Sequence, residues 1–260
     1  MRHAVLTTVL LVACSSPPVV EQPAPPPEPA PAATPEPRPA EWPHLVTIEG
    51  VETPARWDDG DTFAIPGDDG KKLRMRLAGY NTLESYGPVH RWGTWTGAEL
   101  YALAKQAGTV AGNQAWTCII TDEEGGYGRK VADCPDLRAA LLGQGLAHVF
   151  AVDDEPSATD IEVQLQAVES KAGMWAKGAP EGLITSLHSL DEKPDQEATY
   201  NRVAAVSTGV AAKHEHAESY TSCQEVCVGD APPEGDGSCM LYVPYTNRYG
   251  DGKADCLVLE

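Results

Sequence analysis

A proline-rich segment near the start of the chain restricts where a folded core can form. Residues 15–43 contain the run PAPPPEPAPAATPEPRP and are dominated by proline, alanine and glutamate. Such a segment offers too few large apolar side chains to pack a core, so we expect an extended, semi-rigid tether. The folded part of this 260-residue chain should therefore begin near residue 44 and comprise one or two domains.

The residues before the tether indicate export. Residues 1–13, MRHAVLTTVLLVA, have a short basic start and an apolar run too short for a permanent membrane-spanning helix. This pattern predicts a signal peptide. The ending LVAC resembles a bacterial lipobox, which implies that Cys14 is lipidated and becomes the mature N-terminus, and Ser15 after it implies an outer-membrane lipoprotein. The alternative is an ordinary secretory signal with an incidental cysteine.

Six further cysteines remain once Cys14 is assigned to lipid. An even number in an exported chain predicts three disulfides. A hairpin centred on Gly126 would place Cys118 opposite Cys134, because these residues are equally distant from the turn. Opposed residues of two antiparallel strands lie close enough for a disulfide, so we predict this bridge. The pairing of the other four stays open: Cys223, Cys227, Cys239 and Cys256.

Residues 44–180 read as one mainly β domain with helices. HLVTIEGVET, DTFAIPG and KLRMRLAGY predict strands separated by glycine and aspartate turns. Helical patterns follow in TWTGAELYALAKQAG, with Thr94 or Thr96 as cap, in a segment opened by Pro135, and in SATDIEVQLQAVESKAGMW. Residues 181–260 have few large apolar side chains and four cysteines, which predicts a linker and a small disulfide-stapled region.

An ordered set of motifs indicates the function of the 44–180 domain. The motifs are DGDTFAI (59–65), RLAGYNTLE (76–84), YGRKVA (127–132), LLGQGLAHVF (141–150) and ESKAGMW (169–175). Their order and spacing resemble the staphylococcal nuclease (thermonuclease) family over about half the chain. The resemblance implies an α+β fold, a five-stranded OB-fold barrel with three helices. It also implies calcium-dependent endonuclease activity, a hydrolase reaction on phosphodiester bonds.

The resemblance assigns a catalytic set that also makes chemical sense. Phosphodiester hydrolysis needs cations on the phosphoryl oxygens and a positioned water. Arg76 and Arg129 match the two phosphate-binding positions, and an arginine fork suits that task. Glu84 matches the residue that activates the water. Tyr127 is assigned to substrate binding. The neighbouring Arg74 matches no catalytic position.

The implied metal site is Ca²⁺ held by Asp61, Asn81 and Thr82. Calcium prefers hard oxygen ligands. Asn81 stands where the resembled family usually carries aspartate, which removes one negative charge and should weaken or alter metal binding. Leu83, which replaces a proline before Glu84, should make the turn less rigid.

The overall charge argues for weak binding of long nucleic acid. The chain has 38 acidic and 19 basic residues, and residues 44–180 alone have 20 acidic and 12 basic ones. Proteins that hold polynucleotides by counterion release are usually basic. We therefore expect a weak nuclease acting on single-stranded DNA or RNA, or one tuned to short or nucleotide-like phosphodiesters. We also expect the protein to be a monomer anchored to the cell envelope. The alternatives are a catalytically weak or inactive OB-fold binding module, and a structural envelope lipoprotein whose C-terminal region carries the function.

Overall fold

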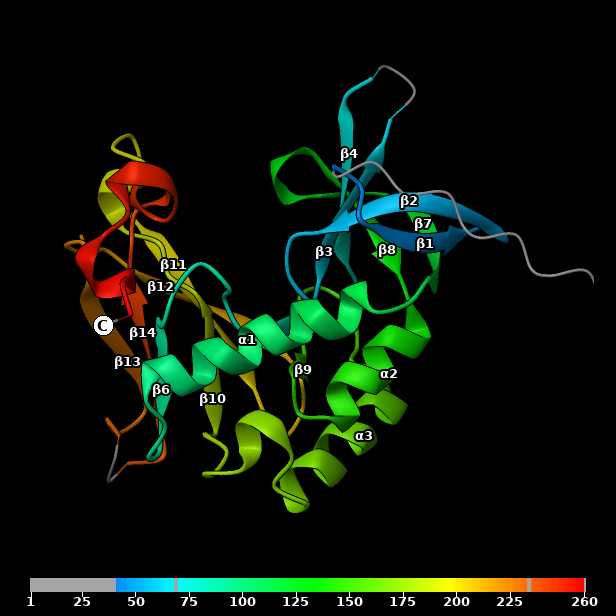
Figure 1. The fold of residues 1–260 in the computed structure, drawn as a ribbon. Helices are drawn as coiled ribbons and strands as arrows, with labels where there is room; N and C mark the ends of the chain where they lie inside the picture. Colours follow the sequence, from blue (N-terminus) through cyan, green and yellow to red (C-terminus); the bar gives the residue numbers. More distant parts are fainter. Residues whose placement is uncertain (1–40, 68–69, 233–234, 260) are drawn as a thin grey trace, which may run out of the picture. The chain divides into compact units, whose positions relative to one another are not determined.

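Six strands close into a β-barrel in the computed structural model, which describes residues 41–67, 70–232 and 235–259 (Figure 1). The strands are β1 (His44–Ile48), β2 (Val51–Trp57), β3 (Thr62–Pro66), β4 (Lys72–Leu77), β7 (Trp116–Gly125) and β8 (Arg129–Asp133). They follow the order β1-β2-β3-β4-β8-β7, with β4 and β8 parallel and β1 closing onto β7 in parallel. The predictions for the signal peptide, Cys14 and the tether up to residue 40 lie outside the described residues. Within those residues, no helix is long and apolar enough to cross a bilayer.

The predicted closed barrel with helices is confirmed, but the count of five strands is wrong. The segment HLVTIEGVET, predicted as one strand, is a hairpin in which β1 and β2 pair from Ile48↔Val51 to His44↔Ala55. Its two-residue turn places Glu49 at φ 51° and Gly50 at φ 80°. A turn with two positive φ angles matches the twist of paired strands. Glutamate is unusual at such a position, which is why the sequence concealed the turn.

Three helices complete this part of the chain. They are α1 (Gly97–Gly112), α2 (Pro135–Gly143) and α3 (Ala158–Glu169). Thr96, one of the two predicted caps, forms a capping box with Glu99 at the start of α1. The helix runs past the expected stop at Gly108 to Gly112. Figure 1 shows α1 running from beside β6 (His90–Trp92) to the barrel, and its length therefore links two parts of the fold.

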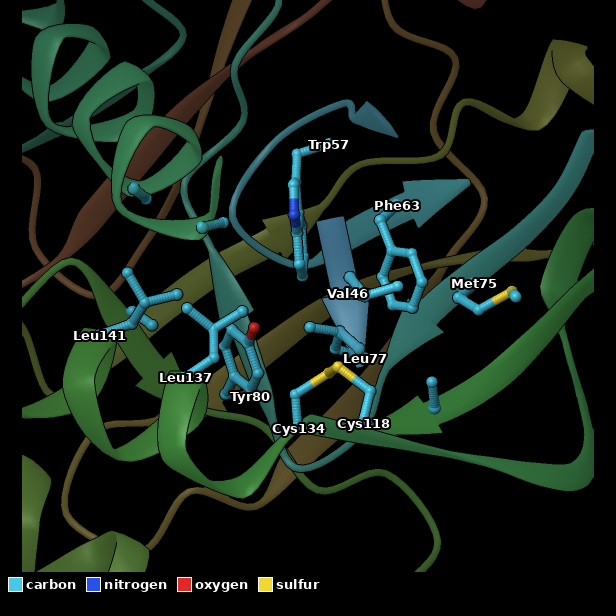
Figure 2. Close-up of a cluster of buried hydrophobic side chains, with 14 of the residues drawn as sticks. Val46, Trp57, Phe63, Met75, Leu77, Tyr80, Cys118, Cys134, Leu137 and Leu141 are labelled. Atoms are coloured by element: carbon cyan, nitrogen blue, oxygen red, sulfur yellow. A yellow bond between two sulfur atoms is a disulfide. The ribbon is translucent and has the colours of Figure 1, made fainter. Parts of the chain in front are cut away.

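The barrel core contains the predicted disulfide. Cys118 and Cys134 are bridged, with Cα atoms 4.2 Å apart. Figure 2 shows this disulfide beside Leu77 among the buried side chains of the core. The register of β7 and β8 pairs Ile119 with Asp133 next to the bridge, then shifts at a bulge before the tip. The predicted hairpin register therefore holds at the cysteines, although the tip is irregular.

The C-terminal region is built from short strands in two sheets, one of which includes β6 of the N-terminal half. It contains β10 (Gly182–Ser186), β11 (Thr199–Ala205), β12 (Ala211–His216), β13 (Gln224–Val228) and β14 (Ser238–Tyr242). One sheet has the order β10-β11-β12, and another has the order β13-β14-β6. The remaining pair is β5 (Tyr80–Thr82) with β9 (Ala147–Val149). Short 3₁₀ turns lie at Gly126–Gly128, Gly173–Trp175, Leu190–Glu192, Tyr245–Asn247, Gly250–Gly252 and Asp255–Leu257.

Two further disulfides staple this region, as the cysteine count predicts. They join Cys223 to Cys256 and Cys227 to Cys239. The second crosses β13 and β14, where the two residues are directly opposed. A buried cluster extends from the barrel's helices into this region and includes Leu100 of α1 and Leu183 of β10. A second buried cluster packs Tyr86 and Val89, which follow RLAGYNTLE, against Tyr242 and Leu257 of the C-terminal region.

Candidate functional site

Asp61 is the buried centre of the site, at the end of the loop between β2 and β3. Its Oδ1 accepts hydrogen bonds from Nη1 of Arg76 and from Oγ1 of Thr62 (3.1 Å). Its Oδ2 accepts from the backbone N–H (2.6 Å) and the hydroxyl (2.9 Å) of Thr82. Burial raises the pKa of Asp61, but Arg76 and Thr82 outweigh it and hold the pKa below its ordinary value. Asp61 is therefore an ionised carboxylate.

Gly60 is the residue that lets this loop reach the site. A Cβ at this position would lie 2.6 Å from Cγ2 of Thr82 and 2.8 Å from Cβ of Ala107 in α1. The hydroxyl of Tyr80 donates to the carbonyl of Gly60 (2.8 Å) and ties the loop to β5. The backbone of the DGD motif therefore lies so close to β5 and α1 that only glycine fits at its middle position.

Arg76 donates hydrogen bonds to two of the predicted metal ligands, Asp61 and Asn81. It lies on β4, and its Nη2 donates to Oδ1 of Asn81 while Nη1 donates to Asp61. The amide nitrogen of Asn81 in turn lies 3.4 Å from Nε2 of His148. Nδ1 of His148 donates to the carbonyl of Val149 (3.0 Å), which leaves Nε2 as the acceptor. Burial lowers the pKa of His148 to about 4, so its neutral form orients the Asn81 amide.

Glu84 is half-buried at the turn after β5. Its backbone N–H donates to Nε2 of His90 (3.1 Å), a buried residue on β6. Burial, with a smaller effect from His148, lowers the pKa of His90 to about 3, so the neutral ring accepts this bond. Burial also raises the pKa of the Glu84 carboxyl, and Arg248 opposes that rise more strongly than Arg76. Glu84 is thus a carboxyl whose pKa is closer to neutrality than usual.

Arg129 is the first residue of β8, in the β7–β8 hairpin that the Cys118–Cys134 disulfide crosslinks at its base. Its Nε donates to the carbonyl of Gly126 (3.0 Å). A Cβ on Gly125 would lie 3.7 Å from Cβ of both Arg129 and Arg76, so the two arginines flank the same small gap. Burial and then the charge of Arg76 lower the pKa of Arg129. The side chain of Tyr127 lies outside what the structure describes, so its predicted role stays a prediction.

Arg248 is a site residue that the sequence motifs missed. It follows the 3₁₀ turn at Tyr245–Asn247, and its Nε donates to the carbonyl of Val243 (2.9 Å). Its guanidinium lies 4.7 Å from the ring centroid of Tyr86, two residues beyond Glu84. The ring of Tyr249 stands 6.2 Å from that of Tyr86. No sequence pattern could reveal Arg248, because only the packing of the C-terminal region onto residues 84–92 brings it here.

Asp59 adds a second carboxyl beside Asp61. Its Oδ1 accepts from the backbone N–H of Asp61 (3.0 Å). Burial and the neighbouring Asp61 charge raise the pKa of Asp59 well above its ordinary value. By contrast, Arg74 forms an exposed ion pair with Asp58 (3.1 Å).

The residue types fit a calcium ion, but in this arrangement the oxygens are engaged. The set of Asp61 carboxylate, Asn81 amide and Thr82 carbonyl oxygens is of the hard kind that Ca²⁺ prefers. Both Asp61 and Asn81 accept hydrogen bonds from Arg76. A cation bound between them would therefore have to displace the Arg76 guanidinium. Elsewhere, Glu225 clusters with Cys227 and Cys239, but these two sulfurs form a disulfide and are not free to bind metal.

Comparison with known proteins leaves the site to be interpreted from its own chemistry. No protein-family model matches the sequence, and none of the curated proteins matches it. The structure brings Asp61, Arg76, Asn81 and Thr82 into direct contact, and it places Glu84 and Arg129 within their electrostatic reach. The site combines the half-buried carboxyl of Glu84 with the guanidinium groups of Arg76, Arg129 and Arg248. Guanidinium groups can bind a phosphate, and a carboxyl can activate a water molecule beside it.

Proposed function

We propose that the protein is a phosphodiesterase of the thermonuclease type, a hydrolase that cleaves single-stranded nucleic acid. The observation that carries the proposal is the half-buried Glu84 carboxyl, whose pKa is raised by burial while the charges of Arg248, Arg76 and Arg129 oppose that rise. A general base works best when its pKa is near the working pH, and a phosphate anion needs several cations around it.

In the proposed reaction, Glu84 takes a proton from a water molecule and the water oxygen attacks phosphorus. The P–O5′ bond breaks, and the departing oxygen takes a proton from solvent. Arg76 and Arg129 bind the non-bridging oxygens and stabilise the charge that develops on them. Arg248 lies on the Glu84 side of the site, where it limits the rise of the Glu84 pKa and adds a third fork.

A calcium ion is part of the proposal, with Asp61, Asn81 and Thr82 as the residues that would hold it. Bound there, the ion would supply Lewis-acid polarisation of a phosphoryl oxygen. The ion's binding is expected to be weak, because Asn81 contributes no charge and Arg76 already satisfies both side chains. Release of Arg76 from Asp61 and Asn81 would at the same time free its fork for the phosphate.

The proposed location is the cell envelope, with a lipid on Cys14 and a tether holding the folded part away from the outer membrane. The disulfides support an oxidising compartment, because such bridges are rare in the cytosol.

A substrate panel tests the activity. The lipid-free protein is incubated with single-stranded DNA, RNA and dinucleotides, each with Ca²⁺ or with EDTA, and the products are separated by size. We expect cleavage with Ca²⁺ that leaves 5′-hydroxyl ends, because the P–O5′ bond breaks. An absence of cleavage on all three substrates would reject the enzyme proposal.

A second candidate, a nucleic-acid-binding module without catalysis, is favoured by one observation. Arg76 faces Asp61 and Asn81 instead of solvent, and a fork held in this way is not available to substrate. The two candidates separate in the same panel, because a binding module would retain the oligonucleotide on a filter but leave it intact.

A further inference from the structure

A row of alternating cations and aromatic rings leads from Arg76 onto the C-terminal sheet. Cζ of Arg76 lies 6.0 Å from the ring centroid of Phe150, and Cζ of Arg202 lies 5.9 Å from the same ring. Arg202 is also 5.5 Å from the ring of Tyr200, and Nζ of Lys213 is 5.0 Å from that ring. The cation–aromatic row, as we call these five residues, thus joins the site to β11 and β12.

The outer cations of the row lack acidic partners. Within the described part of the chain, neither Arg202 nor Lys213 has a carboxylate at ion-pair distance, although acidic residues outnumber basic ones two to one. Four other arginines do have such a partner: Arg56, Arg74, Arg91 and Arg138. Aromatic rings hold Arg202 and Lys213 instead. A cation over a ring keeps its N–H donors for another ligand.

Backbone and buried side-chain hydrogen bonds fix the outer part of the row beside β9 and α3. The backbone N–H of Ala151 donates to the carbonyl of Gly209 (2.9 Å), and that of Ala211 donates to the carbonyl of Ala151 (2.7 Å). Gln164, which is fully buried on α3, accepts from the N–H of Val149 (2.6 Å) and donates to the carbonyl of Val206 (2.5 Å). These bonds hold the β11–β12 hairpin beside β9, so the spacing from Arg76 to Arg202 is set by the fold.

The sheet register places the two outer cations together. Arg202 is directly opposite Lys213 in the antiparallel pair of β11 and β12, so both side chains project from the same face. The exposed Glu215 is opposite Tyr200 and carries the opposite charge, which marks the end of the positive row. Two like charges directly opposed destabilise a sheet. A ligand that carries negative charge would relieve this repulsion.

We propose that the cation–aromatic row binds the phosphate backbone of a single-stranded polynucleotide as it leaves the hydrolytic site. The identity of the polyanion rests on the proposed function, since the row begins at the arginine that would hold the scissile phosphate. A single phosphodiester bound at Arg76 and Arg129 would not contact Arg202 or Lys213. The Phe150 ring lies between Arg76 and Arg202, and the Tyr200 ring lies between Arg202 and Lys213. A flexible strand can follow a path from the barrel rim onto a sheet, whereas a duplex is stiff over this length.

The test measures how binding depends on salt. An E84Q variant, which is expected not to cleave, is titrated with a fluorescent 12-nucleotide strand at several salt concentrations, and anisotropy reports the affinity. Adding R202Q and K213Q should reduce the magnitude of the slope of log K against log salt by about 1.4, since each contact to a single strand contributes about 0.7. Removing Lys105, which lies over Tyr101 (5.9 Å) outside the row, together with exposed Lys171 is the matched control and should leave the slope unchanged.

The possible outcomes distinguish strand binding by the row from hydrolysis at the site. A slope equal to that of the control, or no binding at low salt, would overturn the inference even if the wild-type protein hydrolyses dinucleotides. A reduced slope in a protein that cleaves nothing would support the inference and reject the enzyme. In the cleaving protein, R202Q/K213Q should lose about tenfold more activity on the 12-mer than on a dinucleotide. Competition by polyglutamate that depends on the row would instead assign it to acidic protein segments and contradict the proposal.

Discussion

The amide nitrogen of Asn81 lies 3.4 Å from Nε2 of His148, and this contact fixes the direction of the amide. The His148 ring is neutral and uses Nδ1 as its donor, so Nε2 can only accept. Asn81 must therefore present its nitrogen to His148 and its oxygen to Arg76. The one residue that departs from the expected aspartate is thus matched by a buried histidine suited to an amide.

The first prediction concerns Asn81→Asp. A carboxylate restores the charge that calcium prefers, so Ca²⁺ affinity should rise about tenfold, or about 1.4 kcal/mol. Without metal the variant should be less stable, because a carboxylate has no donor for Nε2 of His148. Isothermal calorimetry with Ca²⁺ measures the affinity and needs no activity. The exposed Asn113→Asp is the matched control, and equal affinities for the two variants would contradict a metal site at Asn81.

The second prediction concerns Arg248→Gln. Arg248 opposes the burial-driven rise of the Glu84 pKa more than any other cation, so its removal should raise that pKa further. The acidic limb of the kcat/KM profile should move to higher pH, and kcat/KM at pH 6 should fall severalfold. The exposed Arg56→Gln leaves the site intact and should keep the wild-type profile. A profile for Arg248→Gln that drops uniformly at every pH would show that Arg248 does not act through Glu84.

The third prediction is a loss of stability on acidification. Burial lowers the pKa of His148 from 6.5 to about 4 and that of His90 to about 3. The unfolded chain therefore binds more protons between pH 6.5 and pH 4, and the free energy of unfolding falls as pH drops through this window. Each histidine should contribute roughly 2 kcal/mol to the loss between pH 7 and pH 5.

Urea unfolding at the two pH values checks this prediction by difference. Asp59 and Glu84 have raised pKa values, so they become less unfavourable on acidification and partly offset the histidines. His148→Gln should reduce the pH-dependent loss, whereas the exposed His214→Gln should not change it. The same loss in both variants would mean that His148 is not buried in its neutral form.

The fourth prediction concerns the Cys118–Cys134 disulfide of the β7–β8 hairpin, which carries Arg129. Cys118 and Cys134 are 16 residues apart. Removing a disulfide that closes a loop of this size should lower the free energy of unfolding by about 3 kcal/mol. The hairpin carries Arg129, so C118A/C134A should also raise KM for the strand. C227A/C239A, which opens β13 and β14, is the comparison and should affect KM less. Denaturant titrations and steady-state kinetics measure the two effects, and equal KM changes would contradict a role in bracing Arg129.

The local part of the site was predictable because its residues lie on neighbouring strands. The motif resemblance assigned Asp61 and Arg76 to one site, and the pairing of Arg76 with Thr62 across β3 and β4 brings the two side chains together. The Cys118–Cys134 bridge followed from hairpin symmetry alone. Glu49 hid the first turn, because its positive φ is a conformation that the residue type rarely adopts.

The long-range part was not predictable from motifs. His90 reaches Glu84 because β6 pairs with β14, and Arg248 reaches Tyr86 because the C-terminal region packs on that segment. Arg202 joins the row through backbone bonds between Ala151 and β12. Contacts of this kind depend on how sheets dock, and no spacing along the chain encodes them.

The central claim is that Glu84 activates water for phosphodiester hydrolysis. The most direct measurement compares wild type with Glu84→Gln on single-stranded DNA with Ca²⁺, beside the matched control Glu162→Gln on the outer surface of α3. We predict that Glu84→Gln lowers kcat by at least about 100-fold, the range expected for loss of a general base, while retaining strand binding and wild-type stability. Cleavage by Glu84→Gln at the wild-type rate would contradict the account.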